Sequence, residues 1–108
     1  MKQKVVGKHQ DDANGNPAGG TTTGTGISIS WQNGPLGRDG DRIEPNGAFV
    51  EGVIAAALDR LEYYQQSKFK CRENALAITK LEEALHWCGH RTEKREEQKV
   101  EGTHAVHA

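Results

Sequence analysis

The chain has 108 residues, of which 34% are hydrophobic and 13 are glycine. A single domain of this size and polarity buries only a thin core, and oligomerisation commonly stabilises such chains. The formal net charge is −1, with 14 basic and 15 acidic side chains. This balance excludes the strongly basic surface that binds duplex DNA or RNA. We therefore expect one domain over residues 1–108 that forms a dimer or a larger homo-oligomer.

The sequence contains no segment that predicts membrane insertion or secretion. No apolar run approaches the ~18 residues of a membrane span, and residues 1–6 lack the apolar stretch of a signal peptide. Cys71 and Cys88 are too few for a disulfide framework and are interpreted as thiols. We expect the chain to stay in the cytoplasm of the cell that makes it.

Residues 1–33 predict β-strands separated by a flexible Gly/Thr-rich loop. Residues 2–8 are one strand candidate, and residues 27–31 (ISISW) are a better one because apolar and polar side chains alternate. The stretch 11–26 (DDANGNPAGGTTTGTG) is interpreted as a flexible loop because its composition cannot pack a core. The two candidate strands are predicted to pair antiparallel.

Residues 34–45 form a predicted loop, since Gly, Asn and Pro supply or fix unusual backbone angles there. From Asn46, a predicted N-cap, the pattern becomes helical and indicates a helical hairpin over residues 46–98. The first helix carries an apolar stripe at steps of three and four. Its members are Val50, Ile54, Ala57, Leu61 and Tyr64. A polar connection at 65–70 leads to a second helix at about 71–98, and a tail over 99–108 leaves the helix near Gly102.

The second helix has a heptad-like seam, apolar in its middle and polar at both ends. The seam consists of Cys71, Asn74, Ile78, Leu81, Leu85, Cys88, Thr92 and Arg95. Asn74 and Arg91 are separated by about 26 Å along a straight helix, at ~1.5 Å per residue. No small ligand could contact both in one chain. Two copies packed antiparallel around a two-fold axis would place Asn74 of one chain beside Arg91 and Arg95 of the other, twice.

Arg91 and Arg95 share one helix face at i, i+4 spacing. Two guanidinium groups at that spacing suit a pyrophosphate or a cyclic phosphodiester. Basic side chains near a helix C-terminus can equally serve the helix dipole and solvent. Asn74 could instead fix the register of helix pairing, and Tyr64 could stack on a base or simply pack in the hairpin. Arg38 could close over a ligand or remain a solvated loop charge.

Several ordered stretches resemble the phage Thoeris anti-defence family of signal sponges, and the hairpin also resembles that of phage anti-CBASS sponges. They are DRLEYY at 59–64, FKCRENALAITKLEEALHW at 69–87, HRT at 90–92 with Arg95, VEGTH at 100–104, and QNGP at 32–35. The resemblance covers roughly residues 27–104. It implies an α+β fold in which a small N-terminal antiparallel sheet precedes a two-helix hairpin that dimerises through its helices, with assembly to hexamers possible.

The resemblance also implies a function. Such proteins bind cyclic ADP-ribose isomers and hold them without cleavage, which blocks Thoeris immunity in the infected host; some also bind cyclic di- or trinucleotides of CBASS. The ligand-binding residues carried over by the family pattern are Arg38, Tyr64, Asn74, Arg91 and Arg95. Among these, the Arg38 assignment rests on a loop of variable length.

Catalytic and metal chemistry find little support in the sequence. His86 and His90 have a spacing that could hold zinc, but no third ligand completes the set. Cys88 and His86, two apart on a helix, do not face each other, so a Cys–His nucleophile is not indicated. We predict no cofactor, no metal and no enzymatic activity. The alternatives are a helical protein–protein adaptor and, with less support, an enzyme that cleaves cyclic nucleotides.

Overall fold

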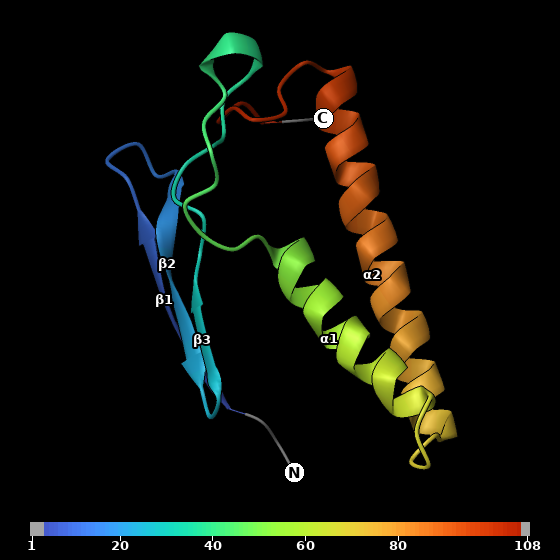
Figure 1. The fold of residues 1–108 in the computed structure, drawn as a ribbon. Helices are drawn as coiled ribbons and strands as arrows, with labels where there is room; N and C mark the ends of the chain where they lie inside the picture. The colour runs from blue at the N-terminus through green and yellow to red at the C-terminus, as the bar shows by residue number, and fades with distance from the viewer. Residues whose placement is uncertain (1–3, 107–108) are drawn as a thin grey trace. The chain divides into compact units, whose positions relative to one another are not determined.

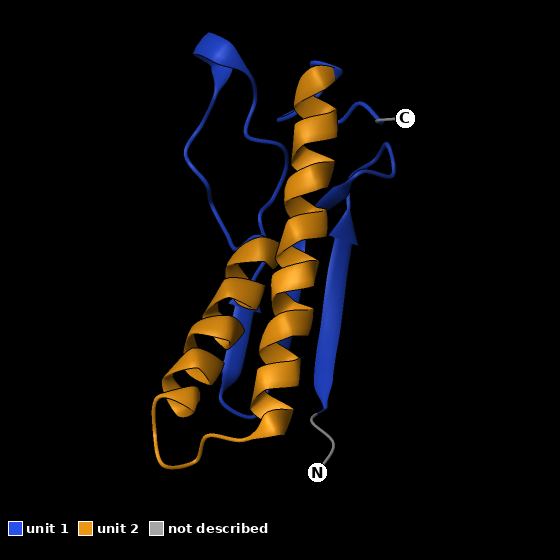
Figure 2. Cartoon of the chain, turned by 90° about the vertical axis from the view of Figure 1, so that its right-hand side faces the viewer, with its two compact units in different colours: residues 1–49, 98–108 blue, residues 50–97 orange. Residues whose placement is uncertain are grey.

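A computed structural model describes residues 4–106 and shows two compact units (Figure 2). One unit, here called the sheet unit, consists of Met1–Phe49 and Gln98–Ala108. The other, the hairpin unit, is the continuous segment Val50–Glu97. The chain thus enters and leaves the hairpin unit from the same sheet unit.

The sheet unit contains three antiparallel strands in the order β1-β2-β3 (Figure 1). Their bounds are Val5–Asp11 for β1, Pro17–Gly24 for β2 and Ile27–Ser30 for β3. The hairpin unit contains two helices, α1 at Val50–Gln65 and α2 at Arg72–Glu97. An antiparallel sheet followed by two helices confirms the predicted α+β fold class.

The prediction of a flexible loop over 11–26 is wrong, because this stretch contains the central strand. Residues Thr21–Gly24 of β2 pair with β1 on one side and β3 on the other. The β-branched threonines favour extended backbone, and β2 is held by hydrogen-bonded strands on both of its edges although its sequence has no apolar alternation. The predicted direct pairing of the two outer strands is therefore also wrong. Residues 1–3, which include the start of the first strand candidate, lie outside the described range.

The turn between β1 and β2 is held by Asp12. Its Oδ1 accepts hydrogen bonds from the backbone N–H groups of Asn14 at 2.8 Å and Asn16 at 3.0 Å. The backbone N–H of Asp12 donates to the carbonyl of Asn16 at 2.9 Å. Side-chain bonds of this kind let Asp initiate a tight turn. They lower the pKa of the Asp12 carboxyl below its ordinary value of 3.8, chiefly through the Asn16 and then the Asn14 N–H.

The prediction that Asn46 caps the first helix is wrong, because α1 begins four residues later, at Val50. The side-chain oxygen of Asn46 accepts from the backbone N–H of Asn33 at 2.8 Å, and its Nδ2 donates to the Asn33 carbonyl at 3.1 Å. The backbone N–H of Asn46 donates to Gln32 Oε1 at 2.8 Å. The side chain and backbone of Asn46 therefore join residue 46 to Gln32 and Asn33, the first two residues of the QNGP stretch.

The two segments continue side by side as a parallel bridge between Trp31 and Ala48. The indole N–H of Trp31 donates to Thr22 Oγ1 at 2.8 Å, which fixes the ring against β2. A Cβ on Gly47 would lie 2.5 Å from the Trp31 carbonyl oxygen. This close backbone approach requires glycine at position 47.

In the hairpin unit, α2 begins one residue after its predicted start and ends one residue before its predicted end. The chain leaves the helix at Lys99, which has a left-handed φ of 57°, and not at Gly102 as predicted. The predicted stripe of α1 is partly right. Ile54 and Leu61 are half-buried, whereas Val50 and Ala57 are exposed; the half-buried face of α1 is completed by Val53 and Leu58.

The seam of α2 is half-buried in a single chain. The half-buried seam positions are Cys71, Asn74, Ile78, Leu81, Leu85, Cys88 and Arg95, and Thr92 is exposed. No residue in the range 4–106 is fully buried, so neither unit encloses a core. No helix in that range has the length and apolar run needed to cross a membrane.

Candidate functional site

Arg91 and Glu51 join the two helices near one end of the hairpin. Arg91 Nη2 donates to Glu51 Oε1 at 2.8 Å, although the two residues are 40 positions apart. Glu51 lies in the first turn of α1 and Arg91 lies near the end of α2. The contact shows that the two helices run antiparallel. The side chains of Arg91 and Glu51 remain 49% and 36% exposed, so the arginine is held but accessible.

Arg95 follows Arg91 by one helical turn and lies in the last turn of α2. Four residues correspond to roughly one turn, so both side chains project from similar sides of the helix. Arg95 is half-buried and Arg91 is exposed. The structure therefore places both predicted arginines together, at the end of the hairpin where α1 begins.

Tyr64 is the penultimate residue of α1 and is held through its backbone and its side chain. Its carbonyl accepts from the backbone N–H of Ser67 at 3.0 Å and from Ser67 Oγ at 2.6 Å. These bonds satisfy a carbonyl that a helix end leaves without a partner. Its hydroxyl accepts from Arg60 Nε at 3.2 Å. The ring is thus fixed at the helix end while 37% of the residue stays exposed.

Arg60 also contacts two aromatic rings. Its guanidinium carbon lies 4.7 Å from the Tyr63 ring centroid and 4.9 Å from that of Tyr64, within the range of cation–π attraction. The hydrogen bond with Tyr64, followed by the charge interaction with the same phenol, raises the pKa of Arg60 above its ordinary value. Arg60 therefore stays fully cationic beside the ring.

Asn74 lies in the first turn of α2, at the connection end of the hairpin, and is half-buried. The same end is closed by Gln65, whose Oε1 accepts from the backbone N–H of Cys71 at 2.9 Å. Tyr64 and Asn74 are thus grouped at the connection between the helices. The arginine pair lies at the opposite end of the same hairpin, so one chain does not bring the four residues together.

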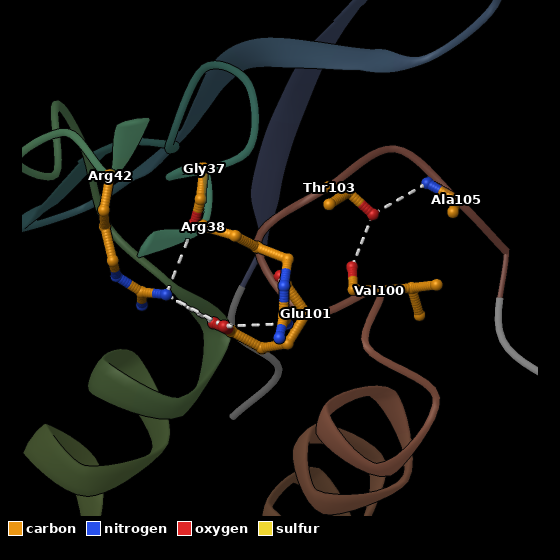
Figure 3. A network of polar contacts seen from close by, with 7 residues as sticks. All are labelled: Gly37, Arg38, Arg42, Val100, Glu101, Thr103 and Ala105. Carbon is orange, nitrogen blue, oxygen red and sulfur yellow. Dashed lines mark hydrogen bonds and ion pairs between the residues drawn. The ribbon is translucent and has the colours of Figure 1, made fainter. Parts of the chain in front are cut away.

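Arg38, the remaining predicted site residue, belongs to the sheet unit. It immediately precedes a short 3₁₀ helix at Asp39–Asp41, within the segment predicted as a loop. Its Nη1 donates to the backbone carbonyl of Glu101 at 3.0 Å and lies 4.0 Å from the Glu101 carboxylate. Figure 3 shows this guanidinium among the polar contacts that link the loop to the C-terminal segment. Arg38 is therefore held in place, with its side chain 24% exposed.

The sequence reasoning missed the partners of the predicted residues. Arg60 could have been found, because it stands at i, i+4 from Tyr64. Glu51, Arg42 and Glu101 gave no local signal, since they meet their partners across separations of 40 and 59 residues. His86 and His90, considered for zinc, lie edge-on to the Trp87 ring at centroid distances of 5.9 and 5.8 Å.

These features define a small α+β protein built around an antiparallel helical hairpin that carries arginines at one end and an aromatic–amide pair at the other. Residues 25–93 match the family described as Acb2/Tad1, hairpin domain. The chain belongs to this family, which confirms the resemblance stated above. The matched range includes Arg38, Tyr64, Asn74 and Arg91.

A phage protein gives a second comparison. Thoeris anti-defense 1 of Bacillus phage SBSphiJ7 is 51% identical to this chain over 77 residues, which are 71% of this chain and 51% of the relative. The chain therefore spans about half the length of this curated relative. Together the two comparisons identify an anti-defence protein family of the Acb2/Tad1 type.

Proposed function

We propose that the protein binds a cyclic ADP-ribose-type signal and sequesters it without cleavage, in the cytoplasm of the infected bacterium. Removal of the signal would block Thoeris immunity. The family membership and the name of the phage relative, Thoeris anti-defense 1, support the biological role. The chemistry of the hairpin supports the ligand class.

The observation that carries the proposal is the division of the candidate residues between the two ends of the hairpin. Tyr64 and Asn74 lie where the helices connect, and Arg91 lies beside Glu51 at the far end. The separation of about 26 Å along α2 exceeds the reach of one small ligand. Antiparallel pairing of two α2 helices would bring the aromatic–amide pair of one chain to the arginines of its partner. Two equivalent ligand sites would result.

The partial exposure of the α2 seam in a single chain is consistent with pairing of two α2 helices. The apolar centre of the seam, at Ile78, Leu81 and Leu85, is only half-buried. A hairpin of two helices gains stability when a second hairpin covers the surface that it leaves exposed. The proposed oligomer is a dimer, and dimers could assemble further into a hexamer.

The charges fit an anion of pyrophosphate type. A guanidinium has five N–H donors, and the hydrogen bond from Arg91 to Glu51 uses one nitrogen, Nη2. Charge-assisted hydrogen bonds contribute roughly 1.5–3 kcal/mol each, and base stacking on Tyr64 about 1–3 kcal/mol. Two arginines, an amide and a stacked ring can together approach the roughly −12 kcal/mol of nanomolar binding.

The decisive experiment is ligand recovery. The purified protein is incubated with cyclic ADP-ribose isomers, separated from free ligand, and then heat-denatured. We expect the bound isomer to be released intact, as judged by mass spectrometry. Release of a hydrolysed product would show an enzyme instead. Calorimetry with the same isomers and with cyclic di- and trinucleotides would define which signals bind, including those of CBASS.

A second candidate function is a helical protein–protein adaptor. It is favoured by two large apolar residues on α2, Leu76 and Trp87, which are 48% and 67% exposed. Large apolar residues left exposed on a helix offer contact area to a partner protein. An adaptor would show no heat of binding with any cyclic nucleotide, whereas a sponge would bind at least one.

A further inference from the structure

We propose that Arg60 positions the ring of Tyr64 for stacking on the base of the nucleotide ligand, and that the base stacks on the face of the ring opposite to Arg60. The inference rests on the proposed function, because it assigns Arg60 a role in the same binding. Arg60 is not proposed to contact the ligand. The residues that hold the ring all belong to the hairpin unit, Val50–Glu97, so the positioning takes place within one unit.

Helix geometry brings Arg60 to two tyrosines at the end of α1. Tyr63 and Tyr64 follow Arg60 by three and four residues, the two spacings at which side chains on a helix meet. The guanidinium carbon lies 4.7 Å from the Tyr63 ring centroid and 4.9 Å from that of Tyr64. The two centroids are 5.9 Å apart. One cation therefore contacts both rings, and the contact is built within about one turn of helix.

The contact between Arg60 and Tyr64 also includes a hydrogen bond. Arg60 Nε donates to the Tyr64 hydroxyl at 3.2 Å. The cation–π contact opposes rotation of the ring away from the guanidinium, and the hydrogen bond opposes movement of the hydroxyl end. Two contacts of different direction therefore hold the Tyr64 side chain in one orientation.

The backbone of Tyr64 is fixed separately, by Ser67. The Tyr64 carbonyl accepts from the backbone N–H of Ser67 at 3.0 Å and from Ser67 Oγ at 2.6 Å. Ser67 Oγ in turn accepts from the backbone N–H of Phe69 at 3.1 Å. Because the main chain is already held, the orientation of the ring depends on its contacts with Arg60. A ring held before binding loses less conformational freedom when a base stacks on it, which increases affinity.

Arg60 also determines which face of the Tyr64 ring is available. An aromatic ring has two faces, and the guanidinium lies over one of them. A base cannot stack where the guanidinium lies, so the opposite face is the one that can receive it. Tyr64 is 37% exposed, which leaves surface for that contact.

The test measures affinity for the cyclic ADP-ribose isomer that the unmodified chain binds most tightly. Arg60→Met removes the charge and the donor but keeps a long side chain of similar helix propensity. It should weaken binding by about fivefold, because contacting groups couple by this order. Arg60→Lys keeps a cation and should recover most of the loss. Lys80→Met is the matched control, since it removes a 74% exposed cation from the middle of α2 and should bind unchanged.

A double-mutant cycle separates positioning from direct contact with the ligand. If Arg60 acts through the ring, Arg60→Met should change affinity by less than about twofold once Tyr64→Ala is present. An undiminished loss in that background would overturn the proposal, because Arg60 would then bind the ligand itself. Unchanged or tighter binding by Arg60→Met alone would also overturn it, the latter because the guanidinium would then cover the face that the base needs. Thermal melts establish that each variant is folded.

A crystal structure of the complex tests the choice of face. The base should stack on the side of Tyr64 opposite to Arg60, and a base found between the two side chains would contradict the assignment. Failure of the unmodified chain to bind any isomer would overturn the proposed function and this role with it. Binding by the unmodified chain with no effect at Arg60 would overturn only the positioning role.

Discussion

The guanidinium of Arg91 lies 2.8 Å from the carboxylate of Glu51, so a residue predicted to bind ligand is already paired within its own chain. The pair joins the start of α1 to the end of α2. Because both side chains are partly exposed, solvent screens the attraction and its contribution to folding is small. Its main consequence is to limit where the Arg91 side chain can point.

Glu51→Gln should therefore change the free energy of unfolding by less than about 1 kcal/mol, the range of exposed ion pairs. Urea denaturation followed by circular dichroism measures this change. A larger loss would show that the hairpin depends on the pair, contrary to its exposure. Glu62→Gln, another exposed carboxylate of α1, serves as the matched control.

Arg91→Ala and Arg95→Ala should each weaken binding of a cyclic ADP-ribose isomer by about tenfold or more, because each removes a charge-assisted contact. The oligomeric state should not change, since the apolar seam is retained. Calorimetry and size-exclusion chromatography measure the two properties. Lys80→Ala removes a cation whose side chain is 74% exposed in the middle of α2, away from both ends of the hairpin, and is the control. Normal binding by both arginine variants would show that the ligand site lies elsewhere.

Tyr64→Ala should weaken binding by about tenfold, as expected for loss of a base-stacking ring. Tyr64→Phe keeps the ring and its cation–π contact with Arg60 but loses the hydroxyl that accepts from Arg60. It should therefore bind far better than the alanine variant. Equal losses in both variants would mean that the hydroxyl, and not the ring, recognises the ligand.

Asp12→Ala should lower the urea midpoint, because the β1–β2 turn loses the three hydrogen bonds that the Asp12 carboxylate accepts from Asn14 and Asn16. The pKa of Asp12 is lowered in the folded state, so its ionised form is favoured by folding. This contribution is complete well above pH 3.8 and disappears as the pH falls through the lowered pKa. The difference in urea midpoint between wild type and Asp12→Asn should shrink accordingly across that range. A constant difference would contradict this role of the carboxylate.

Gly47→Ala should destabilise the sheet unit, because its methyl group would lie 2.5 Å from the Trp31 carbonyl oxygen. The indole fluorescence of Trp31 should shift as the ring loses its fixed place beside Thr22. Gly40→Ala is a suitable control, since a Cβ at Gly40 meets no neighbouring atom within 4 Å. Equal stability of the two variants would argue against a close approach at position 47.

Local sequence patterns predicted the helices, whose backbone hydrogen bonds join residues close in sequence. The bounds of α2 were within one residue because its apolar and polar positions recur over many turns. The central strand β2 was missed because its glycines and threonines resemble a loop until two neighbouring strands pair with it. Asn46 has the composition of a helix cap, but its amide is used by Asn33, thirteen residues earlier.

The candidate site could be anticipated residue by residue, but its internal contacts could not. Helical spacing and the family resemblance pointed to Tyr64, Asn74 and the two arginines. No periodicity links Arg91 to Glu51, or Arg38 to Glu101, because these contacts depend on how distant segments fold back. The proposal that two chains complete each site follows from the separation of the candidate residues between the two ends of the antiparallel hairpin.

The nested arrangement of the chain also orders events during synthesis. The segment that completes the sheet unit, Gln98–Ala108, follows the entire hairpin unit. The ribosome therefore synthesises the loop around Arg38 well before Glu101. Bringing these two residues together closes a loop of 63 residues, which costs more chain entropy than forming a contact between near neighbours in sequence. The strands and the helical hairpin can form as the chain emerges, whereas Arg38 acquires its final neighbours last.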